Sequence, residues 1–263
     1  SMDWDPTASF SAQRVAARIS VLVTGATGFI GQHTIPILKK MGYETYTASR
    51  TGWLRCDLLK NEDIIRVMNQ VKPTHLLHMA WDVTDGYMNR EETNLQWYNA
   101  SMDLVEEFIH HGGYRITVAG TQRNQEVDKT SYGFYKNKLN DDLSRRCKDR
   151  CSYSYGRIHY LYGENEKPSR LVPYIINTII SGGDPSVSGK SIDVMHVKDV
   201  ANALCQILNF DNEGDIDICT GKPVPIYSRP PGCYVRSLFH HDAGSRRCRR
   251  YDDQSRFECS RFC

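Results

Sequence analysis

The stretch Val21-Leu-Val-Thr-Gly-Ala-Thr-Gly-Phe-Ile-Gly31 decides the fold, because it places three glycines between a strand pattern and a helix pattern. Residues 19–24 form a short apolar run with the profile of a buried parallel strand. Gly25 permits a tight turn, Gly28 lets backbone N–H groups approach a pyrophosphate, and Gly31 lets the helix pack closely on the strand. The helix N-terminus adds partial positive charge beneath the phosphates. We therefore expect the phosphate loop of a dinucleotide-binding Rossmann domain.

Strand and helix patterns alternate along the rest of the chain. Helical patterns over 29–41, 61–70, 92–111, 132–146 and 171–180 alternate with strand patterns over 44–48, 75–80, 115–119 and 152–158. Pro36 lies inside the first of these helices and predicts a kink there. The order indicates an α/β protein with a Rossmann-like, doubly wound parallel sheet.

Composition and pattern divide the chain into four parts. They are an N-terminal extension (1–18), a dinucleotide-binding and catalytic Rossmann core (19–165), elements of a small, incomplete C-terminal substrate lobe interleaved with the core (166–226), and an atypical Arg/Cys-rich tail (227–263).

The bulk composition is that of an ordinary soluble enzyme. Of the 263 residues, 40% are hydrophobic and 24% are charged, and the formal net charge is only +2. No apolar run approaches the roughly 20 residues that a membrane span needs, and residues 1–18 lack the apolar segment of a signal peptide. We expect a cytoplasmic protein with neither a membrane nor a nucleic acid as partner.

The cysteines before the tail are scattered and predict reduced thiols. Cys147 and Cys151 are four residues apart and could suggest a metal site. Because no histidine and no second cysteine pair stands nearby, we interpret them as a surface and core pair and expect no metal.

The tail differs from the rest of the chain in composition. Residues 229–263 hold eight arginines, no lysine, four acidic residues and four of the nine cysteines. We expect an unpacked segment. Two alternatives are a zinc site and non-specific binding of nucleic acid through the arginines. The zinc alternative would use Cys233, His240, His241, Cys248, Cys259 and Cys263.

The end of the second strand indicates which dinucleotide binds. An NAD site usually has an acidic residue there to bond the ribose 2′-hydroxyl. This strand ends Thr47-Ala-Ser-Arg50, and Ser49 and Arg50 suit a 2′-phosphate. We therefore expect NADP, with NAD as the alternative, and place Asp57 and Leu58 at the adenine edge.

A tyrosine and a lysine four residues apart form the candidate catalytic pair. Tyr132 and Lys136 lie on one face of the predicted helix over 132–146. A free tyrosine has a pKa of about 10, and a neighbouring ammonium lowers it, which makes the phenol a usable acid or base. Thr121 follows the strand before this helix and could hold a substrate oxygen, or only cap the backbone.

Together these motifs resemble the extended short-chain dehydrogenase/reductase superfamily, in its NAD-dependent epimerase/dehydratase family, which acts on nucleotide sugars. The resemblance covers about residues 19–221. The matching segments are the loop Thr24–Gly31, His78-Met-Ala80, Asn94, Thr121, the pair Tyr132 and Lys136, Arg157–Gly163, and His196-Val-Lys-Asp-Val200.

The resemblance also assigns binding residues and partners. It implies that the cofactor contacts Thr27, Phe29, Ile30, Met79, Ala80 and His159, besides Tyr132 and Lys136, and that the substrate contacts Trp81, Arg170 and His196. It implies a nucleotide-sugar substrate, and a homodimer in which helices 92–111 and 132–146 of two chains form a four-helix bundle. Lys136 would hold the ribose while Tyr132 exchanges a proton with a sugar oxygen.

Three departures from the family pattern limit the function. Gln122-Arg123 stands where dehydratases carry an acidic pair, which disfavours a dehydratase. Ile192 replaces an arginine that grips the nucleotide, and the tail replaces the helices that close the substrate lobe. We expect an NADP-dependent 4-keto-sugar reductase or C4 epimerase. The alternative is a catalytically silent dinucleotide-binding sensor or truncated paralogue.

Overall fold

One sheet forms the middle of the molecule in the computed structural model, which describes residues 19–187, 189–210, 212–226, 248–250 and 256–259. Its strand order is β11-β12-β9-β5-β4-β3-β1-β2. The strands are β1 (Ser20–Thr24), β2 (Glu44–Ala48), β3 (His75–His78), β4 (Arg115–Thr121), β5 (Ser152–Ile158), β9 (Gly214–Ile218), β11 (Cys248–Arg250) and β12 (Arg256–Cys259). The pairs from β2 to β12 are parallel, and β11 pairs antiparallel with β12.

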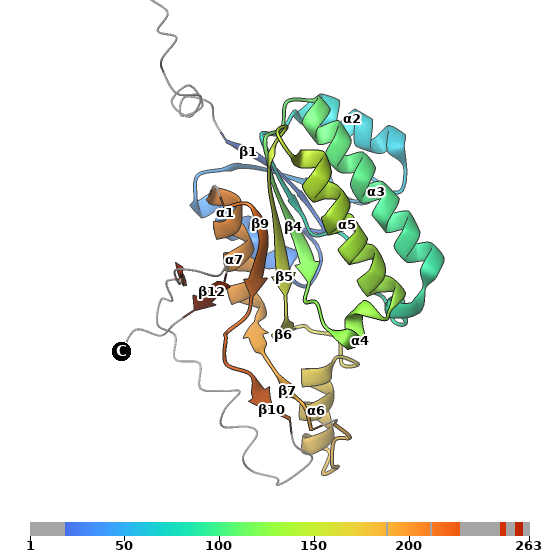
Figure 1. The fold of residues 1–263 in the computed structure, drawn as a ribbon, viewed down its shortest axis with the longest axis vertical. Helices are drawn as coiled ribbons and strands as arrows, with labels where there is room; N and C mark the ends of the chain where they lie inside the picture. The colour runs from blue at the N-terminus through green and yellow to red at the C-terminus, as the bar shows by residue number, and fades with distance from the viewer. Residues whose placement is uncertain (1–18, 188, 211, 227–247, 251–255, 260–263) are drawn as a thin grey trace, which may run out of the picture.

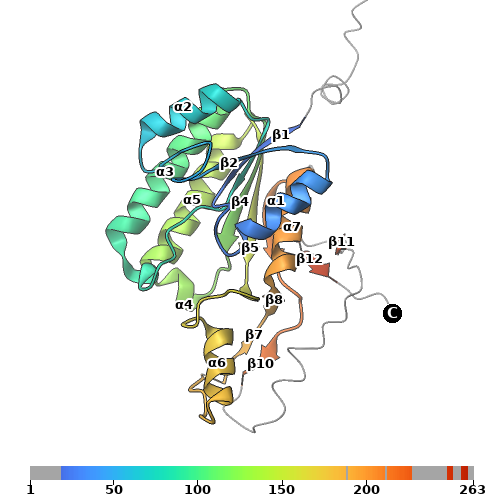
Figure 2. The ribbon, with the colours of Figure 1, turned by 180° about the vertical axis from the view of Figure 1, so that it is seen from behind.

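Helices cover both faces of this sheet, which confirms the predicted doubly wound α/β fold (Figures 1 and 2). One layer holds α1 (Gly31–Lys40) and α7 (Val197–Asn209), and the other holds α2 (Asn61–Val71), α3 (Glu91–His110) and α5 (Ser131–Cys147). In such a sheet, ligands bind at the carboxyl ends of the strands where the winding reverses, here beside β1 and β3.

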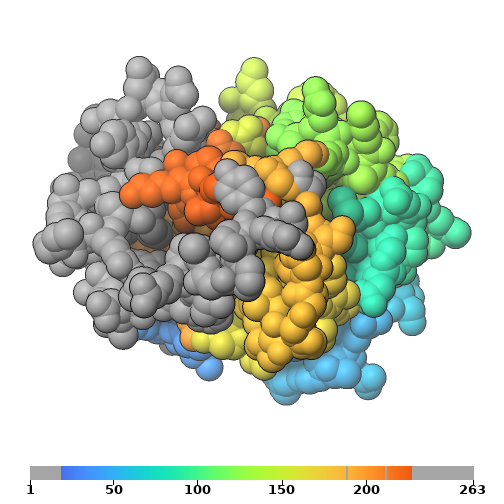
Figure 3. Space-filling view, turned by 90° about the horizontal axis from the view of Figure 1, so that it is seen from below, coloured from blue at the N-terminus to red at the C-terminus, as the bar shows by residue number. Residues whose placement is uncertain are grey.

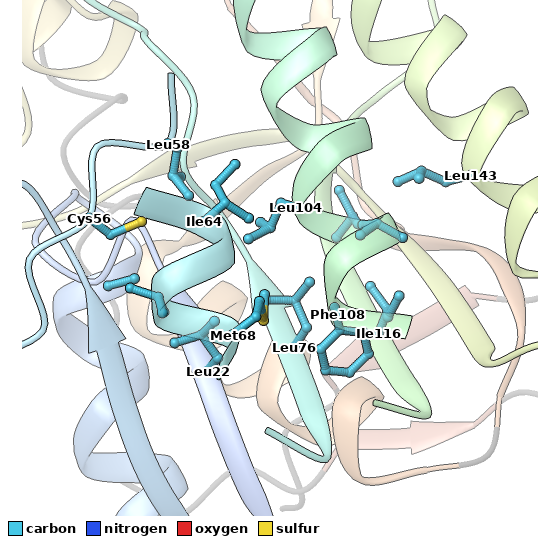
Figure 4. Close-up of a cluster of buried hydrophobic side chains, with 14 of the residues drawn as sticks. Leu22, Cys56, Leu58, Ile64, Met68, Leu76, Leu104, Phe108, Ile116 and Leu143 are labelled. Atoms are coloured by element: carbon cyan, nitrogen blue, oxygen red, sulfur yellow. The ribbon is translucent and has the colours of Figure 1, made fainter. Parts of the chain in front are cut away.

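Strand β1 shows why the apolar run folds this way. Val21, Leu22 and Val23 are each fully buried, because their side chains alternate between two hydrophobic cores. Leu22 packs under α2 and α3 with Leu76 and Phe108 (Figure 4), whereas Val21 and Val23 pack under α1 and α7. A parallel strand covered on both faces therefore appears in the sequence as a continuous apolar run.

A smaller set of elements extends from the carboxyl edge of the sheet. It comprises β6 (Tyr160–Tyr162), α6 (Leu171–Ile180), β7 (Ser191–Ile192), β8 (Val194–His196) and β10 (Val224–Pro225). Strand β6 pairs with β8, and β7 pairs with β10. Figure 3 views this end and shows the yellow and orange residues of these elements beside the green segment that contains α4 (Gln125–Asp128).

Two predicted element boundaries are corrected by local hydrogen bonds. The first helix begins at Gly31, because Phe29 and Ile30 belong to the loop, and it continues through Pro36. The third strand ends at His78, because the N–H groups of the next two residues both turn to Thr24: that of Met79 donates to its carbonyl oxygen and its hydroxyl, and that of Ala80 to its hydroxyl. None of the helices in the described ranges has the length and apolarity that crossing a membrane requires.

The expectation of an unpacked tail is wrong for residues 256–259. They form β12, which pairs in parallel with β9 and places Arg256 opposite Asp217. The physical reason is that β9 would otherwise be an edge strand with a row of unpaired N–H and C=O groups. Cys233, His240, His241 and Cys263 of the proposed zinc set lie outside the described residues, as do 227–247 as a whole.

Candidate active site

The predicted phosphate loop joins β1 to α1 at the carboxyl edge of the sheet. Gly25 has a φ of +72°, and a Cβ there would lie 2.8 Å from the backbone nitrogen of Ala80, so glycine is required. A Cβ on Gly31 would lie 2.0 Å from the Gly25 carbonyl oxygen. Gly31 is therefore required by close contact with the backbone of the loop, whereas the sequence led us to expect close contact between the helix and the strand. A Cβ on Gly28 would meet only the Gly25 oxygen, at 3.2 Å, so the outer side of Gly28 is open.

The start of α1 fits a diphosphate. Within the described chain no side chain caps this helix, and the N–H groups of Gln32 and His33 donate to the carbonyl oxygens of Gly28 and Ile30. The N–H groups of residues 29–31, which precede them, are left for a ligand. Thr27 and Gly28 are exposed on the loop, and Phe29 and Ile30 are half-buried beside it. An uncapped helix N-terminus behind an open glycine is the arrangement that binds a phosphate group.

A basic cavity of about 570 Å³ lies at the end of β2. It is lined by Arg50, Trp53, Arg55, Cys56, Asp57, Lys60, Asp63 and Arg66. Of the residues expected at the adenosine end, Arg50 and Asp57 line this cavity. Ser49 instead donates its hydroxyl to the carbonyl oxygen of Thr51, and Leu58 is buried in the core under α2 (Figure 4).

Tyr132 and Thr121 lie together where α5 begins and β4 ends. Their side chains lie close enough to act as hydrogen-bond partners. The Tyr132 ring is also edge-on to two aromatic rings, those of Tyr87 at 4.9 Å and Trp81 at 6.2 Å between centroids. The candidate catalytic tyrosine is thus held by one hydroxyl and two rings.

Lys136 lies one helical turn beyond Tyr132, and only 3% of it is exposed. Its ammonium donates to the carbonyl oxygen of Ala119 at 2.7 Å and lies 4.5 Å from the centre of the Trp81 ring. Trp81 is fixed in turn, because its indole N–H donates to the side-chain oxygen of buried Asn94 at 2.9 Å. Trp81 therefore contacts both members of the catalytic pair.

Burial dominates the electrostatics of this pair. It raises the pKa of Tyr132 above its usual range, and nearby Tyr87 raises it further, whereas the hydrogen bond with Thr121 lowers it. Burial lowers the pKa of Lys136 to about 7. The sequence predicts that the Lys136 ammonium lowers the pKa of Tyr132. In the structure the amine faces the Ala119 carbonyl and the Trp81 ring instead of the Tyr132 hydroxyl.

A buried histidine fixes the backbone beneath the loop. Thr24 Oγ1 lies 2.7 Å from His78 Nδ1, and His78 Nε2 lies 2.8 Å from the Ser101 hydroxyl. The Ser101 hydroxyl donates to the Trp97 carbonyl, so a neutral ring that donates from Nε2 satisfies every partner. Burial lowers the pKa of His78 to about 3, consistent with that neutral ring.

Arg170 connects the smaller set of elements to the aromatic cluster. Its guanidinium lies 4.9 Å from the centre of the Tyr87 ring and donates to the Tyr87 hydroxyl and the Val83 carbonyl. Sequence reasoning missed Tyr87, which lies in the short 3₁₀ turn η1 (Tyr87–Asn89) outside any motif. Only its packing against Tyr132 reveals it.

His159, expected at the cofactor, and His196, expected at the substrate, both contact neighbouring side chains in the structure. His159 follows β5, and its Nε2 lies 3.3 Å from the Asp217 carboxylate on β9. His196 is the N-cap of α7, where its Nδ1 accepts the Lys198 N–H, and its Nε2 lies 3.3 Å from Glu164. Among the described residues, no three histidine, cysteine or acidic side chains form a group that could hold a metal.

Comparisons with known proteins identify the family of the chain and agree with its fold. The model of the NAD dependent epimerase/dehydratase family matches residues 21–219. CDP-abequose synthase of Salmonella muenchen is 24% identical over 78% of this chain and 76% of its own. UDP-glucose 4-epimerase of Neisseria meningitidis serogroup C is 28% identical over 69% of this chain and 70% of its own. The crystal structure of UDP-glucose 4-epimerase of Thermotoga maritima with UDP-glucose shares the fold, with a TM-score of 0.69, 19% identity and coverage of 79% of each chain.

Proposed function

The chain belongs to the NAD dependent epimerase/dehydratase family, and on that basis we propose that it is a nucleotide-sugar oxidoreductase, either a 4-keto-sugar reductase or a C4 epimerase. The observation that carries the proposal is the juxtaposition of three side chains at one end of the sheet: Tyr132 beside Thr121, and buried Lys136 one helical turn away under the Trp81 ring that also contacts Tyr132. The names of two relatives also refer to sugars linked to CDP or UDP.

The proposed chemistry assigns one task to each residue. Tyr132 gives a proton to, or takes one from, the sugar oxygen whose carbon changes oxidation state, and Thr121 donates a hydrogen bond to that oxygen. We assign Lys136 to a ribose hydroxyl of the dinucleotide. A bound dinucleotide supplies or accepts the hydride. We assign its diphosphate to the loop Thr27–Ile30, with the N–H groups of Phe29 and Ile30 as donors, and its remaining contacts to Met79, Ala80 and His159.

We propose that the substrate contacts Trp81, Arg170 and His196. Trp81 and Arg170 support this assignment because both belong to the cluster around Tyr132 and Tyr87. The two acidic residues between Thr121 and Tyr132 are engaged elsewhere, since Glu126 forms an ion pair with Lys190 and Asp128 accepts a hydrogen bond from Asn137. This engagement supports a reductase or epimerase over a dehydratase.

Replacing Tyr132 tests the mechanism. We expect Tyr132→Phe to lose all measurable turnover of a nucleotide sugar while calorimetry still detects dinucleotide binding, because only the proton donor is removed. Tyr135→Phe is the matched control, since Tyr135 lies on the same helix but donates to Glu91. Unchanged turnover in Tyr132→Phe would refute the mechanism. A wild-type chain that binds the dinucleotide but turns over no CDP-, UDP-, GDP- or dTDP-sugar would favour the silent sensor instead.

We propose NADP as the preferred cofactor, although the name of the family refers to NAD. The support is the cavity at the end of β2, whose lining includes four basic side chains, among them Arg50. We expect Arg50→Ala to weaken NADP binding about tenfold, since a hydrogen bond to a charged group contributes roughly 1.5–3 kcal/mol. NAD binding should stay within about twofold, because NAD lacks the phosphate.

Titration calorimetry with both dinucleotides measures this difference. Arg145→Ala is the control, because Arg145 is exposed on α5 and pairs with Asp142. Tighter binding of NAD than NADP to the wild-type chain, or equal loss of both in Arg50→Ala, would contradict the proposed preference.

We also infer a homodimer formed by α3 and α5. The support is that these helices pack side by side in the outer layer (Figure 1), and that Leu95 on α3 and Phe134 on α5 are 39% and 55% exposed. Large apolar side chains exposed on adjacent helices favour burial against a partner.

A further inference from the structure

Two cysteine thiols meet where α5 ends and β5 begins. Cys147 is the last residue of α5, and Cys151 stands one residue before β5. The N–H of Cys151 donates to the Cys147 carbonyl oxygen at 2.9 Å, and Asp149 between them has a φ of +60°, so the chain turns back tightly. The two thiols lie close enough to act as hydrogen-bond partners. Forming a disulfide, with its S–S bond of about 2.05 Å, therefore needs only a local movement.

The two thiols differ in exposure and in charge. Cys147 is buried in the core beneath α3 and α5, whereas Cys151 is partly exposed. The hydrogen bond from Cys147 lowers the pKa of the Cys151 thiol, and the nearby Arg150 guanidinium lowers it further. The same hydrogen bond, followed by burial, raises the pKa of Cys147. Cys151 is thus the more nucleophilic and more accessible thiol of the pair.

Two other cysteines show that this environment is particular to the pair. Cys56 and Cys205 are buried in the two hydrophobic cores. Burial raises the pKa of Cys56 to about 11 and that of Cys205 to about 12. Both should be inert as nucleophiles under conditions in which Cys151 reacts.

We propose that Cys147 and Cys151 form a redox-active dithiol that becomes an intramolecular disulfide by exchange with a low-molecular-weight disulfide. The Cys151 thiolate attacks one sulfur of that disulfide, forms a mixed disulfide and releases one small thiol. Cys147 then loses its proton and attacks the Cys151 sulfur, which releases the second small thiol. Two protein thiols are oxidised, the small disulfide is reduced to two thiols, and the protons pass to those products.

Peptide mapping after treatment of the native full chain with oxidised glutathione tests the proposal. Trypsin cleaves after Arg146, Lys148 and Arg150, so an internal disulfide joins two separate peptides, Cys147-Lys148 and Cys151–Arg157. We expect this linked pair in the wild-type chain and its loss on treatment with a reductant. The peptides that contain Cys56 and Cys205 should react at least about tenfold more slowly.

Single variants separate the two roles. In Cys147→Ser, the Cys151 peptide should keep one glutathionyl group, because no second thiol displaces it. In Cys151→Ser, Cys147 should stay unmodified in the native chain, because it is buried. The absence of the linked pair in the wild type, or a mixed disulfide on Cys151 that persists beside an intact Cys147, would overturn the proposal. The wild-type result decides the matter even if a variant fails to fold.

Discussion

At the scale of single residues, burial in the candidate site disfavours the charged forms of two ionisable side chains. Lys136 is neutral in the folded chain above a pH of about 7, because burial lowers its pKa to about 7. In the unfolded chain the same amine stays protonated up to a pH of about 10.4. Tyr132, whose pKa burial raises, is a neutral phenol over the same range.

This difference at Lys136 predicts a pH dependence of stability. Between those two pH values unfolding takes up a proton, so the free energy of unfolding rises with pH, by up to about 1.4 kcal/mol per unit. Lys136→Met removes the amine and should remove this rise. Urea unfolding at about pH 7.5 and about pH 9 gives the change in the free energy of unfolding with pH for the wild type and for Lys136→Met. Parallel slopes in the wild type and the variant would show that Lys136 is charged when folded.

At the scale of elements, one buried arginine secures the end of a helix that contacts the sheet. Arg115 on β4 is only 3% exposed and donates to the carbonyl oxygens of Ile207 and Leu208 at the end of α7, and of Asn212 just beyond it. Its Nη atoms also donate to the hydroxyls of Ser152 and Ser154. A cation at a helix C-terminus satisfies carbonyls that the helix cannot.

Removal of this arginine should destabilise the fold. We expect Arg115→Met to cost about 3 kcal/mol, because three carbonyl oxygens and two hydroxyls each lose a charged hydrogen-bond donor at once. The exposed control Arg145→Ala should change stability by less than about 0.5 kcal/mol. Chemical denaturation monitored by circular dichroism measures both. If Arg115→Met is as stable as Arg145→Ala, the contact does not secure α7.

The elements also show how far sequence reasoning reaches. Helices α2, α3 and α5 follow from amphipathic patterns, since each buries one face and exposes the other. Helix α7 has no counterpart among the expected elements, although its sequence has a clear apolar face; the segment is interpreted only as the continuation of the motif at His196. The two- and three-residue strands β6, β7, β8 and β10 depend on pairing partners distant in sequence, which no local pattern encodes.

The candidate site likewise contains residues that sequence reasoning could find and residues that only the packing reveals. The glycines and the pair Tyr132 and Lys136 could be found because their spacing is fixed by local backbone geometry. Tyr87 and the orientation of Lys136 toward Trp81 could not, because they arise from packing between a loop, a strand end and a helix. The buried position of Leu58 likewise depends on how α2 covers β1 and β3.

At the scale of the whole molecule, the proposed dimer gives the last test. The aspartate double variant Leu95→Asp/Phe134→Asp places two charges on α3 and α5, and burying unpaired charges in an interface costs several kcal/mol. We expect the wild-type chain to elute as a dimer in size-exclusion chromatography with light scattering, and the double variant as a folded monomer. The matched control is Trp53→Asp, because Trp53 is 80% exposed but lies at the cavity beside β2. It should leave the dimer intact.

Two results would exclude α3 and α5 as the interface: a monomeric wild type, or a double variant that stays dimeric. Dissociation of the Trp53→Asp control alone would instead place the interface on the β2 side of the sheet.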